Sequence, residues 1–190
     1  MFSDFPNEVD IMSSWKSSDV ITSINCITYN HQDFILECLR GCLSQKTSFA
    51  FEIVVHDDAS LDGTQDILIA ASERYPNIIK LVLQSENQFS RNKNPFVTAK
   101  KYSQGKYIAL CEGDYYWSLS DKLERQITFL EKNTEFSCHF HGYKVYQQEL
   151  SEFRESIDRF PDEGSMVLSQ YDLKICKVMA RIPTVVYRSN

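Results

Sequence analysis

Residues 51–71 read Phe-Glu-Ile-Val-Val-His-Asp-Asp-Ala-Ser-Leu-Asp-Gly-Thr-Gln-Asp-Ile-Leu-Ile-Ala-Ala. The stretch up to His56 is apolar and rich in β-branched residues, which predicts a strand. Asp57 and Asp58 end this strand, and residues 62–64 open a helix that we expect to run through Ala71. A strand, a polar loop and a helix in this order form the repeating unit of an α/β fold.

The same alternation extends from this unit in both directions along the chain. Further strands are predicted at residues 20–28, 78–83 and 106–111, with helices from residue 33, at 95–102 and at 121–132. Asp33 is the expected cap of the first of these helices. Short strand-like runs follow at 138–146 and 184–187. Strands that alternate with helices imply right-handed crossovers, and therefore an α/β fold with a mostly parallel sheet.

Length and composition suit one globular domain. The 190 residues are 43% apolar, which is enough for a hydrophobic core, and we expect an N-terminal extension over residues 1–17 before a domain over 18–190. A net charge of −6 argues against a nucleic-acid binder, because phosphate contacts need a basic surface. The first 18 residues lack a secretory signal, and no stretch reaches about 20 apolar residues, so we expect a cytoplasmic protein.

The six cysteines form no Cys-x-x-Cys pair, and we expect them to be reduced and buried. Cys38 and Cys42 are interpreted as core residues rather than a metal pair, because no histidine or further cysteine lies nearby at ligand spacing. His139 and His141 would share one face of a strand, where a structural role is favoured. Four basic residues are candidate phosphate contacts, although a solvated surface suits most of them: Arg91, Lys93, Lys100 and Lys101.

Polar clusters follow three of the predicted strands directly: Thr28-Tyr29-Asn30, Asp57-Asp58 and Glu112-Gly113-Asp114. In open α/β sheets, ligands bind outside the carboxyl ends of the strands, so these clusters mark the expected site. Mg²⁺ and Mn²⁺ take one or two protein carboxylates and complete their coordination with water and phosphate oxygens. Glu112 and Asp114 flank a glycine that lets the backbone approach a ligand, so they can hold such a cation against a diphosphate. The alternative is a solvated acidic turn.

The aspartates at the end of the second strand suit a nucleoside. A carboxylate there can accept the imide N–H of uracil or bond a ribose, and the alternative is a helix cap. We assign Asp58 to the ligand and Asp62 to capping or the loop. Asp62-Gly63-Thr64 would suit a phosphatase only with an aspartate two residues earlier, where Ser60 stands. Glycine-rich loops for dinucleotides or nucleoside triphosphates are absent from the sequence.

These clusters, in this order, resemble the inverting glycosyltransferases of family 2, whose GT-A fold is a Rossmann-like three-layer sandwich. The resemblance covers residues 18–145, with matched segments at 28–30, 52–64, 86–88, 105–110, 112–117 and 122–126. Bacterial enzymes that build surface polysaccharides look most similar. The resemblance implies transfer of a sugar, with inversion, from a nucleotide-sugar donor, expected to be a UDP-sugar. The implied acceptor is a saccharide or a lipid-linked molecule. Because a lipid-linked acceptor lies in the membrane, peripheral association of the protein with the inner face of the membrane is also expected.

The resemblance also implies roles for single residues. The implied nucleotide site consists of Thr28, Tyr29, Asn30, Asp57, Asp58, Glu112 and Gly113, and the implied site for Mn²⁺ or Mg²⁺ consists of Asp114 and Glu112. Tyr29 would stack on the base, and Asp58 would hold the uracil or the ribose. Trp117 and Lys122 would belong to the loop and helix beside the donor sugar.

The sequence departs from the family pattern at three points. Glu112 replaces the commoner aspartate, and Tyr115 stands where many members have a further aspartate. The catalytic base of similar enzymes comes from a later segment, so we expect it beyond Asn190 and expect the usual C-terminal segment to be lacking. Acidic residues of the later polar stretch are weaker candidates for the base: Glu152, Glu155, Asp158 and Asp162.

Two alternatives follow the favoured interpretation. A non-catalytic or truncated nucleotide-sugar-binding domain comes second, because the expected base lies outside the chain. A sugar nucleotidyltransferase comes third, because it would need a glycine-rich loop with Arg or Lys after the first strand, where residues 28–32 read Thr-Tyr-Asn-His-Gln.

Overall fold

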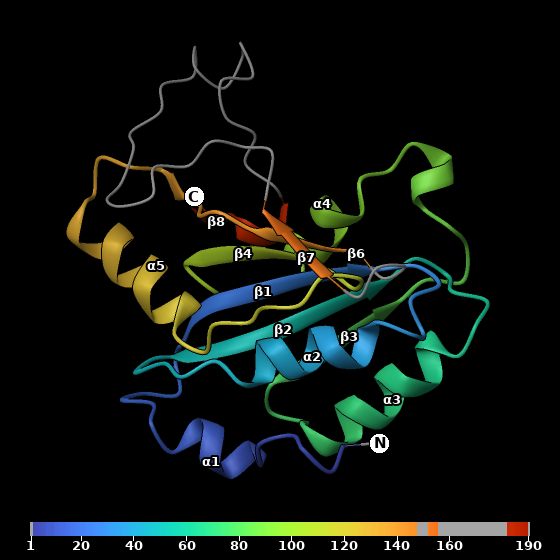
Figure 1. Cartoon of the computed structure of the whole chain (residues 1–190), viewed down its shortest axis with the longest axis horizontal. Coiled ribbons are helices and arrows are strands. Elements are labelled where there is room, and N and C mark those ends of the chain that lie inside the picture. The colour runs from blue at the N-terminus through green and yellow to red at the C-terminus, as the bar shows by residue number, and fades with distance from the viewer. Residues whose placement is uncertain (1, 148–151, 156–181, 190) are drawn as a thin grey trace.

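The computed structural model of the chain describes residues 2–147, 152–155 and 182–189 (Figure 1). Its α-helices are α1 (Glu8–Met12), α2 (Ile35–Leu43), α3 (Thr64–Arg74), α4 (Pro95–Lys100) and α5 (Lys122–Lys132). The strands are β1 (Val20–Thr28), β2 (Ala50–Asp57), β3 (Ile79–Leu83), β4 (Tyr107–Glu112), β5 (Cys138–His139), β6 (Lys144–Gln147), β7 (Glu152–Glu155) and β8 (Val186–Arg188). Short 3₁₀ helices lie at η1 (Phe89–Arg91) and η3 (Ile182–Thr184).

A six-stranded sheet with the order β3-β2-β1-β4-β8-β5 forms the centre of the molecule. The four strands β3, β2, β1 and β4 are parallel, and β8 runs antiparallel between β4 and β5. Strands β6 and β7 pair as a separate antiparallel ribbon. The predicted α/β fold with a mostly parallel sheet is confirmed.

Helices cover both faces of this sheet, which gives the three layers that were expected (Figure 1). On one face, Leu39 of α2, Leu68 of α3 and Ile127 of α5 belong to the main core. On the other face, Ala99 of α4 packs with Val54 and Val82 in a smaller cluster. All eight residues of β2 are buried, as expected for a parallel strand that is covered on both sides.

Most predicted elements are confirmed, but three details are wrong. Asp33 does not cap α2, because the helix begins at Ile35, its N-cap residue is Phe34, and no side chain caps it. The Ile35 N–H instead bonds the His31 carbonyl at 2.8 Å. The run at 138–146 is two short strands rather than one, and a 3₁₀ turn precedes β8 where a strand was expected from residue 184.

The N-terminal residues pack against the main core instead of extending away from it. Ile11 of α1 is buried, and Phe5 and Trp15 contact the core from its edge. The Tyr75 hydroxyl donates a hydrogen bond to the Pro6 carbonyl at 2.9 Å. This segment therefore contributes apolar burial to the folded state.

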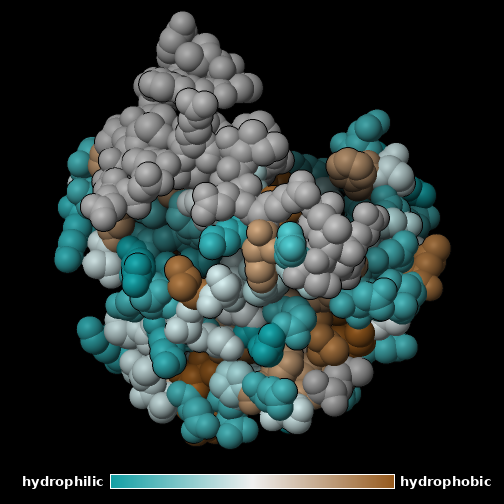
Figure 2. Space-filling model, viewed as in Figure 1, coloured by the Kyte–Doolittle hydropathy of each residue, from teal (hydrophilic) through white to brown (hydrophobic). Residues whose placement is uncertain are grey.

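Figure 2 shows the face of the molecule that carries α2 and α3. Hydrophilic residues predominate among the described residues of this face, and apolar ones form small separate groups. Among the helices that the structure describes, none combines the length and the apolar character needed to cross a membrane.

Candidate functional site

The three polar clusters meet at one edge of the sheet because their strands are neighbours in the order β2-β1-β4. In the register, Thr28 pairs with Asp57 and Ile27 pairs with Glu112. Two backbone hydrogen bonds continue the pairing past the strand ends, from the Asp58 N–H to the Thr28 carbonyl at 2.9 Å and from the Gly113 N–H to the Ile27 carbonyl at 2.8 Å. The expected convergence of the clusters is thus confirmed by the topology.

A cavity of about 940 Å³ opens at this edge. One wall comes from the strand ends and the following loops: Ile27, Thr28, Tyr29, His31, Asp58 and Glu112. The opposite wall comes from the segment before α4, from α4 itself and from η3: Asn87, Phe89, Ser90, Asn92, Lys93, Asn94, Pro95, Phe96 and Ile182. Four of the predicted nucleotide residues, Thr28, Tyr29, Asp58 and Glu112, therefore face one space.

Asp58 joins the two walls. Its carboxylate accepts the backbone N–H groups of Gln88 at 2.6 Å and Phe89 at 3.0 Å, and the Asn87 side chain donates to the Asp58 carbonyl at 3.2 Å. Each oxygen of a carboxylate has two lone pairs, so both oxygens keep an acceptor position for a ligand. Asp58 can hold the opposite wall and contact a ligand at the same time.

Apart from the candidate phosphate contacts Arg91 and Lys93, the wall of residues 87–96 was not among the predicted site residues. Asn92 adopts a left-handed conformation with φ 58°, and the Asn94 side chain caps α4 by accepting the Phe96 N–H at 2.9 Å. Pro95 occupies the start of that helix, where its missing N–H costs nothing. The Asn94-Pro95 pair is the sequence signal that could have predicted the turn at the end of this polar stretch.

Asn30 and Asp57 do not line the cavity; their side chains order the loop between β2 and α3. The buried Asp57 carboxylate accepts the Ser60 N–H at 3.0 Å, the Ser60 hydroxyl, and the Gln65 side chain at 2.6 Å. The Asn30 side chain accepts the Leu61 N–H at 2.8 Å, and its own backbone has φ 55°. Asp62 accepts the Thr64 N–H at 3.0 Å and the Gln32 N–H at 3.1 Å, which confirms its predicted role in the loop.

Gly113 lies in a confined position between Glu112 and the exposed Asp114. A Cβ at Gly113 would be 2.6 Å from Oγ1 of Thr28 and 2.8 Å from Nδ1 of His31, so only glycine fits. Neither Gly113 nor Asp114 is among the residues that line the cavity. Partial burial, and next the negative charge of Asp114, raise the pKa of Glu112. The two carboxylates therefore interact through their charges.

The donor set at this turn fits a hard divalent cation. Two carboxylates that repel each other are stabilised when a cation lies between them, and carboxylate oxygens are the ligands that Mg²⁺ and Mn²⁺ prefer. The neighbouring Thr28 Oγ1 and His31 Nδ1 are buried and have no hydrogen-bond partner within the described residues. These atoms remain available for polar groups of a ligand or its water shell.

Trp117 and Lys122 are not among the residues that line the cavity. Trp117 is buried and donates from Nε1 to the Pro183 carbonyl at 3.0 Å. Lys122 is 4% exposed, bonds Gln126 at 2.7 Å and places Nζ 3.9 Å from the centre of the Trp117 ring. Burial lowers the pKa of Lys122 to about 8.

The favoured structural roles of the two histidines are supported. His139 packs 4.8 Å from Phe129, ring centre to ring centre, and its Nδ1 lies 3.1 Å from the Gln126 amide. His141 follows β5 rather than extending it, and neither histidine lines the cavity.

Of the four basic candidates, Lys93 alone lines the cavity. Arg91 forms an exposed ion pair with Glu86 at 2.6 Å, and Lys100 lies 5.9 Å from the centre of the Tyr187 ring.

Among the weaker candidates for the catalytic base, Glu152 and Glu155 lie at the two ends of β7. Asp158 and Asp162 lie outside the described residues.

Comparison with known proteins identifies relatives across most of the chain. The model of the family "Glycosyl transferase family 2" matches residues 23–175. TuaG of Bacillus subtilis (strain 168), named for teichuronic acid biosynthesis, is 34% identical over 142 residues, which are 73% of this chain and 51% of TuaG. The Escherichia coli protein WfaP is 32% identical over 123 residues, which are 65% of this chain and 46% of WfaP. WfaP is named as a UDP-Glc:α-D-GlcNAc-diphosphoundecaprenol β-1,3-glucosyltransferase.

Solved structures with the same fold include a mannosyltransferase and S. aureus TarS. The mannosyltransferase PcManGT of Pyrobaculum calidifontis, in complex with GDP-Man and Mn²⁺, superposes with a TM-score of 0.53 and 25% identity over 62% of this chain and 34% of its own. S. aureus TarS 1–349 superposes with a TM-score of 0.61 and 22% identity over 90% of this chain and 47% of its own. This chain spans about half the length of the curated relatives that it matches. The matching family model, which covers most of the sequence, and the three-layer architecture agree: the chain belongs to glycosyl transferase family 2 and has the GT-A fold.

Proposed function

We propose that the chain binds the donor in a glycosyltransferase of polysaccharide biosynthesis, which moves a sugar from a UDP-sugar to a saccharide or lipid-linked acceptor with inversion. The observation that carries this proposal is the convergence of Tyr29, Asp58 and Glu112, from three neighbouring strand ends, on one cavity. Relatives whose names specify UDP-Glc and a diphosphoundecaprenol-linked sugar support the choice of donor and acceptor class.

The nucleoside part of the donor is assigned to Tyr29 and Asp58. Tyr29 is 41% exposed at the cavity wall, so one face of its ring can receive a base, an interaction worth roughly 1–3 kcal/mol. Asp58 keeps free acceptor positions on both oxygens and can take the imide N–H of uracil. The amides and hydroxyl of Asn87, Ser90 and Asn92 offer further polar contacts on the opposite wall.

The diphosphate part of the donor is assigned to the turn after β4, where Glu112 and Asp114 would hold Mn²⁺ or Mg²⁺. When bound, the cation supplies positive charge that stabilises the leaving diphosphate. PcManGT, whose structure contains Mn²⁺ with GDP-Man, supports a divalent metal in this fold. Lys93, on the opposite wall, can add one further positive charge near the phosphates.

Asn30, Asp57 and Gly113 position the site rather than contact the nucleotide. Asn30 and Asp57 fix the loop that follows β2, and Gly113 lets β4 end directly against Thr28. The acidic residues that line the cavity are Asp58 and Glu112, and both already have roles with the donor. We therefore assign the catalytic base to a segment outside the described residues.

A thermal-shift screen tests the donor assignment. UDP with Mn²⁺ should raise the unfolding temperature more than GDP or ADP with Mn²⁺, since stabilisation grows with ligand concentration over Kd. UDP in a chelator should give a much smaller shift. The Asp114→Asn variant should lose the Mn²⁺-dependent part of the shift, and Asp66→Asn, an exposed acid on α3, should keep it. No shift with any nucleotide would reject the site.

Release of UDP from a UDP-sugar separates the two leading functions. Turnover that depends on Mn²⁺ and on Asp114 supports a transferase. Binding of UDP without release, in the presence of a range of saccharide and lipid-linked acceptors, supports a domain that only binds the donor. The described cavity walls carry no third acidic side chain that could act as the catalytic base. A domain that only binds the donor is therefore the second function to be tested.

A further inference from the structure

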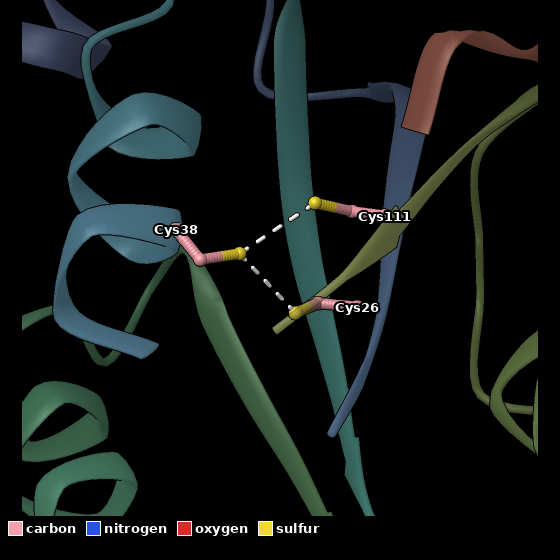
Figure 3. A group of neighbouring side chains, drawn as sticks. All are labelled: Cys26, Cys38 and Cys111. Carbon is pink, nitrogen blue, oxygen red and sulfur yellow. Dashed lines mark hydrogen bonds between the residues drawn. The ribbon is translucent and has the colours of Figure 1, made fainter. Parts of the chain in front are cut away.

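Four buried cysteines lie together under the turn after β4. Cys26 comes from β1, Cys111 from β4, and Cys38 and Cys42 from successive turns of α2, and all four are fully buried. Figure 3 shows the Cys38 side chain pointing from α2 toward those of Cys26 and Cys111 on the strands. The Cys38 Sγ is 3.7 Å from the Cys26 Sγ and 3.5 Å from the Cys111 Sγ.

The sheet register explains why this cluster could not be found by spacing along the chain. Cys26 and Cys111 are direct partners across the parallel pair of β1 and β4, although 85 positions separate them in the sequence (111 − 26 = 85). Helix α2 crosses this pair with Cys38 and Cys42 on its buried face. The lack of a further cysteine at ligand spacing along the sequence therefore says nothing about this cluster, and Cys38 and Cys42 are buried in the core as expected.

Three of the sulfur atoms, those of Cys26, Cys38 and Cys111, lie at spacings close to those of a tetrahedral thiolate site. With Zn–S bonds of about 2.3 Å, two sulfurs on a tetrahedral zinc ion lie about 3.8 Å apart. The ligand atoms of Cys26, Cys38 and Cys111 all lie within 4.8 Å of one another, and small side-chain rotations bring them to that spacing. Cys42 is outside this group of three; it lies one turn after Cys38 on the same buried face of α2, and a change of its side-chain rotamer would bring its sulfur in as a fourth ligand.

A buried positive charge beside the cluster is a second and independent observation. Lys122 on α5 is 4% exposed and forms no ion pair with an acidic side chain among the described residues; its ammonium bonds Gln126 and faces the Trp117 ring. This ammonium is close enough to Cys42 and Cys111 to interact with their charge. A buried lysine without a carboxylate partner is costly, and a negatively charged thiolate site would give it a counter-charge.

We propose that Cys26, Cys38, Cys111 and Cys42 bind one Zn²⁺ ion, as a structural site separate from the acidic turn at Glu112 and Asp114. Binding forms Zn–S bonds as the S–H bonds break, and the thiol protons pass to solvent, with no change of oxidation state. Because the site has no exposed atom, zinc enters while the chain folds. Tetrahedral sulfur ligands select Zn²⁺, whereas the oxygen ligands of the acidic turn suit Mn²⁺ or Mg²⁺.

Such an ion would fasten β1, α2 and β4 to one another directly below the proposed donor site. The Cys38 and Cys111 thiols lie 3.5 and 3.7 Å from the carbonyl oxygen of Glu112, the residue at the end of β4. Zinc would therefore act on the stability of the fold and on the position of the Glu112 turn. The proposal does not depend on the identity of the donor.

The test uses the chain purified under reducing conditions from cells grown with added zinc, then passed through a column with chelator. Elemental analysis should find about one zinc ion per chain, because a buried site exchanges slowly. The Cys38→Ala variant should lose most of this zinc and unfold at a lower temperature. Cys138→Ala is the matched control, since Cys138 lies on β5 outside the cluster, and it should retain the zinc. A zinc-free wild-type chain would overturn the proposal.

X-ray absorption at the zinc edge of the wild-type chain gives a readout that needs no variant. A sulfur shell at about 2.3 Å supports the cysteine site even if Cys38→Ala fails to fold. A shell of oxygen or nitrogen alone would place the zinc on carboxylates or histidines and would reject the cysteine site. Loss of UDP binding with an intact sulfur shell would count against the proposed function and leave the zinc site standing.

Discussion

A Cβ placed on Gly113 would lie 2.6 Å from the Oγ1 atom of Thr28. This contact joins the end of β4 to the end of β1, and the hydrogen bond from the Gly113 N–H to the Ile27 carbonyl fixes the same junction. The carboxylates that flank Gly113 are therefore held beside Thr28, at the end of β1, by the packing of two strand ends. Any side chain at this position must push the strand ends apart.

The Gly113→Ala variant should be destabilised by about 1–3 kcal/mol, because its Cβ meets buried atoms of Thr28 and His31. Urea unfolding followed by circular dichroism gives the free energy. Gly63→Ala is the matched control, since its Cβ would meet only the flexible end of Gln32 at 3.1 Å, and it should be nearly neutral. Equal stabilities for the two variants would show that the end of β4 adjusts freely.

Removal of the Tyr29 ring should weaken UDP binding by about 1–3 kcal/mol, which is roughly a 5- to 150-fold rise in Kd. Tyr29→Phe should bind nearly as well as the wild type, because stacking needs the ring and not the hydroxyl. Isothermal titration with UDP and Mn²⁺ measures both. Tyr102→Ala, an equally exposed tyrosine away from the cavity, should leave Kd unchanged. An unaltered Kd for Tyr29→Ala would reject the stacking role.

Glu52 anchors a buried polar network at the opposite end of the sheet from the cavity. Its carboxylate accepts the Ser23 hydroxyl at 2.6 Å, the Gln104 N–H at 2.7 Å and the Lys80 ammonium at 3.0 Å. Glu52→Ala should cost about 3 kcal/mol of unfolding free energy, because it leaves buried donors without an acceptor. Glu86→Ala breaks the exposed pair with Arg91 and should cost at most about 1 kcal/mol. Similar losses for the two would contradict the network.

Acid should destabilise the chain through His141. Burial, and next the positive charge of Lys122, lower the pKa of His141 to about 4, whereas the unfolded residue has the ordinary value of 6.5. Between these values the unfolded state binds the extra proton, so stability is full above pH 6.5 and falls toward pH 4. The slope from one proton is at most about 1.4 kcal/mol per pH unit. His141→Gln should flatten the urea-derived profile in this window, and parallel profiles would contradict the pKa.

The sequence carried enough information to predict the sheet and the meeting of the polar clusters at one of its edges. Apolar runs such as 51–56 and the polar residues after them identify strands and strand ends, and parallel neighbours then bring Thr28, Asp58 and Glu112 together. The direction of individual side chains was beyond that reasoning. Asp57 and Asp58 are adjacent, yet one binds the 60–65 loop and the other lines the cavity, because successive residues at a strand end point to different sides.

Two further features depend on packing between distant segments. The cavity wall at 87–96 is placed by hydrogen bonds from Gln88 and Phe89 to Asp58, which no periodic pattern encodes. The cysteine cluster depends on the register that pairs Cys26 with Cys111 and on the crossing of α2 above them. Spacing along the chain finds metal sites within one element and misses those built across a sheet.

The turn at Glu112 and Asp114 is proposed to hold a divalent cation for the diphosphate of a donor bound beside Tyr29 and Asp58. The most direct measurement is calorimetric titration of the chain with UDP, with Mn²⁺ or with chelator, for the wild type and Asp114→Asn. We expect at least tenfold tighter binding with Mn²⁺ for the wild type, a gain of about 1.4 kcal/mol, and loss of that gain in Asp114→Asn. Equal affinities with and without Mn²⁺, or an unchanged Mn²⁺ effect in the variant, would contradict it.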